Sequence, residues 1–128
     1  MTTPLALVVD DDPDIRLITE LALARVAGWE VITADRAQAG IDLARTHHPS
    51  VVLMDLMMPE MDGIEATRLL HADPMTADIP VVLVTAKSAV RGDEPPWAGV
   101  DFAGVIPKPF NPRTLAQEVS EMVGWSVD

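Results

Sequence analysis

The chain has 128 residues, enough for one domain with a sizeable core and too few for two. Apolar residues make up 48% of it, which favours a globular fold over disorder, and the absence of cysteine excludes disulfides and thiolate chemistry. The net charge of −11 disfavours direct contact with nucleic acid or anionic membranes, and no apolar run reaches the roughly 20 residues of a membrane span. We therefore expect a cytoplasmic protein, folded as one domain over residues 1–128 with a core at about 4–123 and a short tail at 124–128.

Strand-like and helix-like stretches alternate through the first half of the chain. The apolar run "LALVV" at 5–9 predicts a strand buried on both faces. A helix is expected over 14–27, because apolar residues recur there at helical spacing, at Ile15, Ile18, Leu21, Ala22 and Val26, and Gly28 ends the pattern. A second strand at 29–34, a second helix at 36–48 and a third buried strand at 50–54 follow.

The second half continues the alternation with one interruption. Residues 62–73 predict a helix, 79–85 a fourth strand and 103–107 a weaker fifth strand. A closing helix is expected from Asn111, which can act as N-cap before Pro112, to Gly124. The segment between the last two strands holds Pro95 and Pro96, so we expect a loop there and at most a short helix over 96–102.

Five strands alternating with helices predict a parallel sheet covered on both faces. Ligand sites in such sheets lie beyond the carboxyl ends of the strands. Asp10, Asp11 and Asp12 follow the first strand, and the later strand ends supply polar side chains as well, namely Asp55, Thr85 and Lys108. Residues far apart in the sequence should therefore converge on one edge of the sheet.

This set of side chains suits phosphoryl chemistry assisted by a divalent cation. Carboxylates at Asp10, Asp11 and Asp55 cannot all stay ionised in a small space without a cation, and all-oxygen ligands favour Mg²⁺, with Mn²⁺ as a second choice. An aspartate can accept a phosphoryl group as an acyl phosphate, and Asp55, alone at its strand end, is the natural candidate. Lys108 would supply a positive charge and Thr85 a hydroxyl to the phosphoryl oxygens.

Each of these residues also has an ordinary structural explanation. Aspartates before a helix are often N-caps, a single Asp or Thr at a strand end is usually loop chemistry, and a single lysine is usually solvated. The prediction of a site therefore rests on four strand ends that carry complementary groups.

Four blocks of the sequence resemble the receiver domain of two-component response regulators, in order and at typical spacing. They are "VVDDDPDIR", "VVLMDLMMPEMDGIE", "VVLVTA" and "PKPF". The resemblance implies a flavodoxin-like, doubly wound α/β fold, with a five-stranded parallel sheet in the order 2-1-3-4-5, helices on both faces and a fourth helix that is short or irregular here. It also implies a phosphoacceptor switch, whose chemistry is limited to self-phosphorylation and autodephosphorylation, rather than an enzyme.

The resemblance further implies roles for individual residues. Asp55 would accept the phosphoryl group from a histidine kinase or a histidine phosphotransfer protein. Asp11 and Asp55 would bind Mg²⁺ through their carboxylates, Asp10 through water and Met57 through its carbonyl. Thr85, Lys108 and the backbone N–H groups of Met57 and Ala86 would hold the phosphoryl oxygens.

The resemblance also implies features of the backbone and of the residues around the phosphoryl group. The Lys108–Pro109 peptide is expected to be cis, which would aim the lysine inward. Asp12 should cap a helix rather than bind metal, and Met57 and Lys87 should flank the phosphoryl group. Phosphorylation would change the packing around Thr85 and the fifth strand and so alter the binding of a downstream protein. The receiver itself is expected to be a monomer or a weak dimer.

Two departures from the family pattern affect the output rather than the active site. Val105 stands where receivers usually carry an aromatic switch residue, and "GDEPP" interrupts the helix before the fifth strand. A receiver-like binding module that works without phosphate therefore remains an alternative. A phosphatase of the haloacid-dehalogenase type is disfavoured, because the residue two after Asp12 is Asp14 rather than Thr or Val, and the "PKPF" region lacks the acidic pair that such enzymes need.

Overall fold

The computed structural model describes residues 3–86, 97 and 99–125. Over these residues strands and helices alternate along the chain as far as the fourth strand, as the sequence pattern predicts. The elements in chain order are β1 (Leu5–Val9), α1 (Pro13–Leu21), the π-helical turn η1 (Ala22–Val26), β2 (Glu30–Ala34), α2 (Ala37–His47), β3 (Val51–Asp55), α3 (Gly63–Ala72), β4 (Val81–Ala86), β5 (Gly104–Lys108) and α4 (Leu115–Val123).

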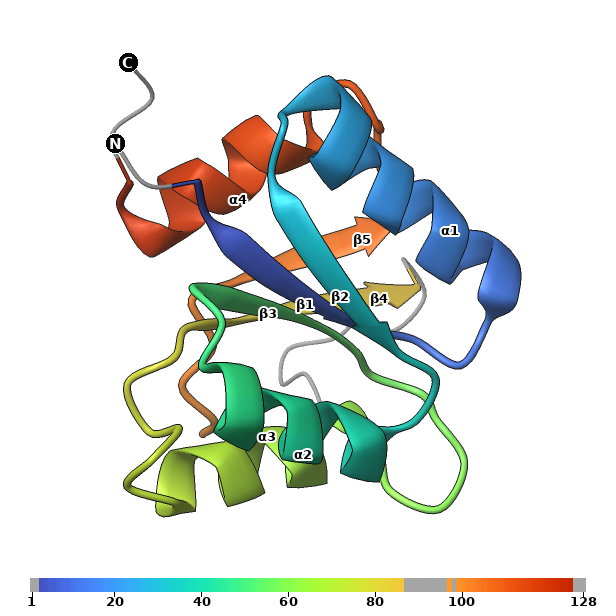
Figure 1. Cartoon of the computed structure of the whole chain (residues 1–128). Helices are drawn as coiled ribbons and strands as arrows, with labels where there is room; N and C mark the ends of the chain where they lie inside the picture. Colours follow the sequence, from blue (N-terminus) through green and yellow to red (C-terminus); the bar gives the residue numbers. More distant parts are fainter. Residues whose placement is uncertain (1–2, 87–96, 98, 126–128) are drawn as a thin grey trace.

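The strands form one parallel sheet in the order β2-β1-β3-β4-β5, which confirms the predicted topology. Helices α1 and α4 cover one face of the sheet, and α2 and α3 cover the other (Figure 1). The central strand β3 is buried at every position, which explains its uninterrupted apolar sequence up to Asp55.

Successive residues of the central strands β1, β3 and β4 contribute to different core clusters. Ala6 and Val8 of β1 pack under α1 and α4, whereas Leu7 and Val9 pack under α2 and α3. This alternation follows from the two-residue period of a strand. The sheet is thereby fixed between two apolar layers, and the carboxyl ends of its strands meet at one edge.

The first helix differs from the sequence expectation in which residues it buries. Thr19, Ala22 and Leu23 are buried, whereas three of the five apolar residues that predicted the helix are exposed: Ile18 at 42%, Leu21 at 40% and Val26 at 57%. The buried residues Thr19, Ala22 and Leu23 follow one another at three- and four-residue spacing, so the inward face of the helix runs beside Ile18 and not through it. Regular α-helical hydrogen bonding ends at Leu21, and a π-helical turn follows over Ala22–Val26.

The closing helix begins later than predicted. Asn111 is not its N-cap: the Asn111 side chain accepts a hydrogen bond from the Arg113 N–H (2.9 Å), and its carbonyl accepts one from the Thr114 N–H (3.1 Å). Residues 111–114 therefore form a separate turn, and α4 starts at Leu115. Its predicted end is confirmed, because Gly124 caps the helix in the left-handed conformation (φ 79°).

The expected loop and short helix before β5 lie largely outside the described residues. Of that segment Trp97 and residues 99–102 are described, and the Val100 N–H donates to the Trp97 carbonyl in a turn (3.1 Å). None of the helices in the described part of the chain is long and apolar enough to cross a membrane.

Candidate phosphoacceptor and metal site

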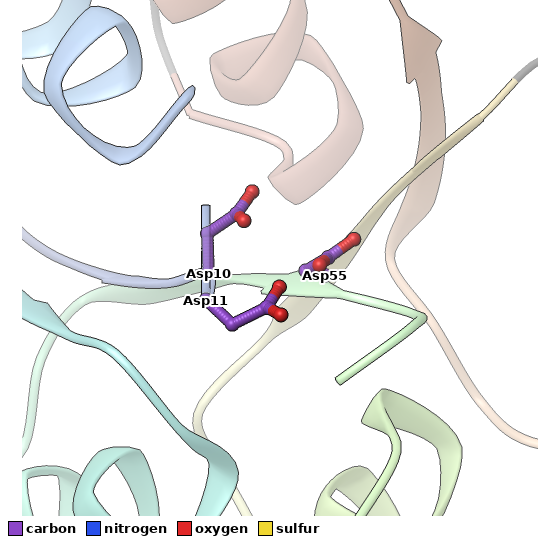
Figure 2. Close-up of side chains that lie close together, drawn as sticks. All are labelled: Asp10, Asp11 and Asp55. Atoms are coloured by element: carbon purple, nitrogen blue, oxygen red, sulfur yellow. The ribbon is translucent and has the colours of Figure 1, made fainter. Parts of the chain in front are cut away.

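Three aspartates lie together at the carboxyl edge of the sheet. Asp10 and Asp11 follow β1, and Asp55 ends the neighbouring strand β3 (Figure 2). One carboxylate oxygen from each lies within 4.8 Å of the others, a separation that one cation can bridge. Asp10 and Asp55 are buried, whereas Asp11 is exposed, so the cluster opens to solvent on the Asp11 side.

Lys108 joins the two buried carboxylates. Its Nζ lies 3.0 Å from Asp10 Oδ2 and 3.1 Å from Asp55 Oδ1, and the lysine side chain is largely buried at the end of β5. The Lys108–Pro109 peptide is cis, as the sequence motif predicts. The lysine is therefore a constituent of the cluster and not a solvated surface residue.

The electrostatics of Asp55 show that its charge is poorly compensated. Burial raises the pKa of Asp55 and the charge of Asp10 raises it further, while Lys108 lowers it, with a net value of about 6. Burial acts to lower the pKa of Lys108, but its hydrogen bond to Asp10 and the charges of Asp10 and Asp55 leave that pKa above its ordinary value. The ionised form of Asp55 is therefore disfavoured in the metal-free site, mainly by burial, and a cation bound beside it would stabilise that form.

Thr85 supplies an unused hydrogen-bonding group. It lies near the end of β4, pairs in register with Pro107 of β5 and is 1% exposed. Its hydroxyl oxygen has no hydrogen-bond partner among the described residues. A buried hydroxyl without a partner is costly, which is typical of a group that meets its partner only when a ligand is present.

The loop after β3 is shaped by its Asp62-Gly63 pair. Asp62 caps α3 by accepting a hydrogen bond from the Glu65 N–H (2.9 Å), and the Gly63 N–H donates to the Leu56 carbonyl (2.9 Å). A Cβ at position 63 would overlap the backbone carbonyl oxygen of Asp55. Only glycine permits this close approach, so the pair holds the chain segment that carries Asp55.

The remaining predicted residues are found around the same edge. Asp12 is the N-cap of α1, as expected, and its side chain accepts hydrogen bonds from the N–H groups of Asp14 and Ile15. Met57 is 72% exposed two residues after Asp55, and Ala86 is the exposed last residue of β4. Val105 is partly buried on β5 in register with Leu83, and Lys87 lies outside the described residues.

Sequence reasoning missed one polar residue at this edge. The Arg16 guanidinium, one turn into α1, donates from Nη1 to the Asp10 carbonyl oxygen at 2.8 Å. Its position in an ordinary helix gives no pattern that would have identified it.

The strand order and the carboxylate–lysine cluster define a doubly wound α/β protein with an acidic site at its strand ends. The chain belongs to the response regulator receiver domain family, whose model matches residues 6–120. It is therefore a receiver domain of the kind used in two-component systems.

Relatives of known role support the family assignment. The polar-differentiation response regulator DivK of Brucella ovis is 33% identical over 124 residues, which cover 97% of this chain and 98% of DivK. The phosphate regulon transcriptional regulatory protein PhoB of Pseudomonas aeruginosa is 35% identical over 121 residues, which cover 91% of this chain and 50% of PhoB.

Solved structures agree on the fold. The chemotaxis protein CheY4 of Vibrio cholerae superposes with a TM-score of 0.83 at 26% identity, covering 94% of this chain and 99% of CheY4. The receiver domain of the sensor histidine kinase PA1611 of Pseudomonas aeruginosa gives a TM-score of 0.84 at 24% identity, covering 96% of this chain and 99% of that one. That structure holds a magnesium ion in its active site cleft.

Proposed function

We propose that this receiver domain is a phosphoacceptor switch in which Asp55 receives a phosphoryl group from the phosphohistidine of a kinase or phosphotransfer protein. The observation that carries the proposal is the cluster around Asp55. Its carboxylate is nearly buried, contacts the Lys108 ammonium at 3.1 Å and lies within bridging distance of the Asp10 and Asp11 oxygens. The oxygen of Asp55 would form the new P–O bond while the P–N bond of the donor breaks.

The carboxylates fit a divalent cation of the magnesium type. Three carboxylate oxygens within 4.8 Å provide a hard, all-oxygen ligand set with an open side for water. Asp10, Asp11 and Asp55 would hold Mg²⁺ or Mn²⁺, together with the Met57 carbonyl. When bound, Mg²⁺ neutralises charge on the phosphoryl oxygens.

Groups already present in the chain would hold the phosphoryl group after transfer. The Lys108 ammonium would pair with a phosphoryl oxygen, since it already faces Asp55. The unpartnered Thr85 hydroxyl would donate to another, and the N–H groups of Met57 and Ala86 complete the proposed donor set. Satisfying the buried Thr85 hydroxyl in this way gives phosphorylation a means to change the packing of β4 against Val105 on β5.

The proposal assigns a signalling role rather than turnover of a substrate. Phosphoryl transfer to Asp55 and its later hydrolysis would be the chemistry of the site, and a change in the binding of a downstream protein would be the output. A phosphate-independent binding module with the same fold is the competing function, because Val105 replaces the usual aromatic switch residue.

Intact mass spectrometry tests the proposal against this alternative. The protein is incubated with Mg²⁺ and a small phosphodonor such as acetyl phosphate, beside Asp55→Asn and a sample with chelator. A gain of one phosphoryl group in the parent alone supports the proposal. No gain in a parent that binds Mg²⁺ favours the phosphate-independent module.

A further inference from the structure

The carbonyl group between Asp10 and Asp11 is held by a side chain. Asp10 lies one residue beyond β1, where the sheet ladder with β3 has ended at the Val9–Met54 pair. The Asp10 N–H still donates to the Ala34 carbonyl of β2 (3.1 Å), but no backbone N–H among the described residues donates to the Asp10 carbonyl. The Arg16 guanidinium donates to it instead, from Nη1 at 2.8 Å.

This hydrogen bond fixes a peptide that both predicted metal ligands share. The Asp10 carbonyl belongs to the same planar peptide as the Asp11 N–H, so holding the carbonyl orients the backbone from which the Asp11 side chain projects. The Asp10 side chain is fixed independently, since Oδ1 accepts from the Asp12 N–H (2.9 Å) and Oδ2 from Lys108. Asp11 is exposed, and no hydrogen bond to its carboxylate is found among the described residues, so the backbone at this peptide sets the direction in which its Cα–Cβ bond projects. Figure 2 shows the Asp11 side chain pointing toward Asp55.

We propose that Arg16 is a positioning residue for the metal site, which acts by holding the Asp10–Asp11 peptide so that the Asp11 carboxylate faces Asp55. The inference rests on the proposed function, because it assigns Arg16 a role toward the cation that the three carboxylates would bind. A planar guanidinium suits this task, since it presents several N–H donors in fixed directions and keeps its charge at all physiological pH values.

A positioning role for Arg16 and a purely electrostatic effect of its charge predict opposite changes in Mg²⁺ affinity when Arg16 is removed. Arg16 is a cation close to an anionic site, so removing its charge alone would tighten the binding of Mg²⁺. If Arg16 orients a ligand, removing it weakens binding, and loss of such supporting contacts typically costs about 10–100-fold in metal affinity. The sign of the change therefore separates the two explanations.

Calorimetric titration of the metal-free protein with MgCl₂ tests the role of Arg16. Arg16→Met keeps the aliphatic length and removes the donors, and we expect its dissociation constant for Mg²⁺ to rise about tenfold or more. Arg16→Lys keeps one donor group and the charge, and should fall between the parent and Arg16→Met. Arg25→Met, on the exposed side of η1, removes the same charge without touching the Asp10 carbonyl and should not weaken binding.

An NMR signal provides a second readout that needs no metal. The amide resonance of Asp11 in the metal-free protein should shift in Arg16→Met and stay in place in Arg25→Met. Unchanged or tighter Mg²⁺ binding in Arg16→Met overturns the proposal. If that variant does not fold, the decision falls to Arg16→Lys, where parent affinity overturns the proposal and weaker binding supports it.

Different measurements test the proposed function of Asp55 and the proposed role of Arg16. A parent protein that binds Mg²⁺ but takes up no phosphoryl group disproves phosphorylation at Asp55. The order of Mg²⁺ affinities among the Arg16 variants still decides whether Arg16 positions the site.

Discussion

Replacing Asp55 by asparagine should stabilise the metal-free protein at neutral pH. The pKa of Asp55 is raised from 3.8 to about 6, mainly by burial and secondarily by Asp10, so ionising this carboxyl costs more in the folded state than in the unfolded chain. A shift of roughly two units corresponds to about 3 kcal/mol. Asparagine keeps the shape of the side chain and cannot ionise, so Asp55→Asn should recover up to about 3 kcal/mol at pH 7.

The stabilisation by Asp55→Asn should depend on pH, because the parent loses stability as Asp55 ionises. Between pH 4 and pH 6 folded Asp55 retains a proton that the unfolded chain has lost, so the free energy of unfolding of the parent falls as pH rises through this window. Asp55→Asn lacks this contribution. The stability difference between variant and parent should therefore be near zero at pH 4, grow up to about pH 6 and stay constant above it.

Urea unfolding followed by circular dichroism, with chelator present, measures this difference at pH 4 and pH 7. Glu121→Gln removes an exposed carboxylate from α4 and serves as the matched control, with an expected change within about 0.5 kcal/mol at either pH. An Asp55→Asn protein that is no more stable than the parent at pH 7 would refute the reasoning. So would a stability gain that is equal at both pH values.

Three further substitutions test the site through stability and phosphorylation. Thr85→Val removes the unpartnered buried hydroxyl and should stabilise the metal-free protein by about 1 kcal/mol in urea unfolding, while lowering phosphoryl uptake by mass. Lys108→Met leaves Asp10 and Asp55 facing each other, so it should destabilise the protein by about 3 kcal/mol at pH 7 and by less at pH 4, where Asp55 holds a proton. Gly63→Ala places a methyl group against the Asp55 carbonyl, so it should lower the melting temperature and reduce phosphoryl uptake; parent-like values for both would contradict the assigned close approach.

Much of the fold could be predicted because the three central strands, β1, β3 and β4, are buried on both faces. Their short apolar runs alternate with segments in which apolar residues recur at helical spacing, a pattern that favours a parallel sheet. The polar residues that follow the runs then lie at one edge of that sheet. Asp55 and Lys108 illustrate this, since 53 residues separate them in sequence and 3.1 Å separates their charged atoms. The strand order itself came from the family resemblance and not from the periodicity.

Features that depend on single hydrogen bonds could not be predicted. The helix α4 starts later than predicted because the Asn111 side chain accepts a hydrogen bond from the nearby backbone N–H of Arg113. This local hydrogen bond competes with capping of a helix by the same residue. The inward face of α1 includes Thr19 in place of Ile18, a polar residue that the spacing of apolar residues cannot mark as buried; its hydroxyl donates to the Ile15 carbonyl (2.7 Å). Arg16 was missed because a guanidinium on a backbone carbonyl leaves no pattern of residue types.

The central claim, that Asp55 is the phosphoacceptor, is tested most directly by locating the modified residue. Protein treated with Mg²⁺ and acetyl phosphate is reduced with borohydride, which converts an acyl phosphate to the corresponding alcohol, and is then digested and sequenced by mass spectrometry. The account predicts homoserine at position 55, dependent on Mg²⁺, with Asp10 and Asp11 unmodified. Homoserine at position 10 or 11 with Asp55 intact, or no reduced residue in a protein that binds Mg²⁺, would contradict it.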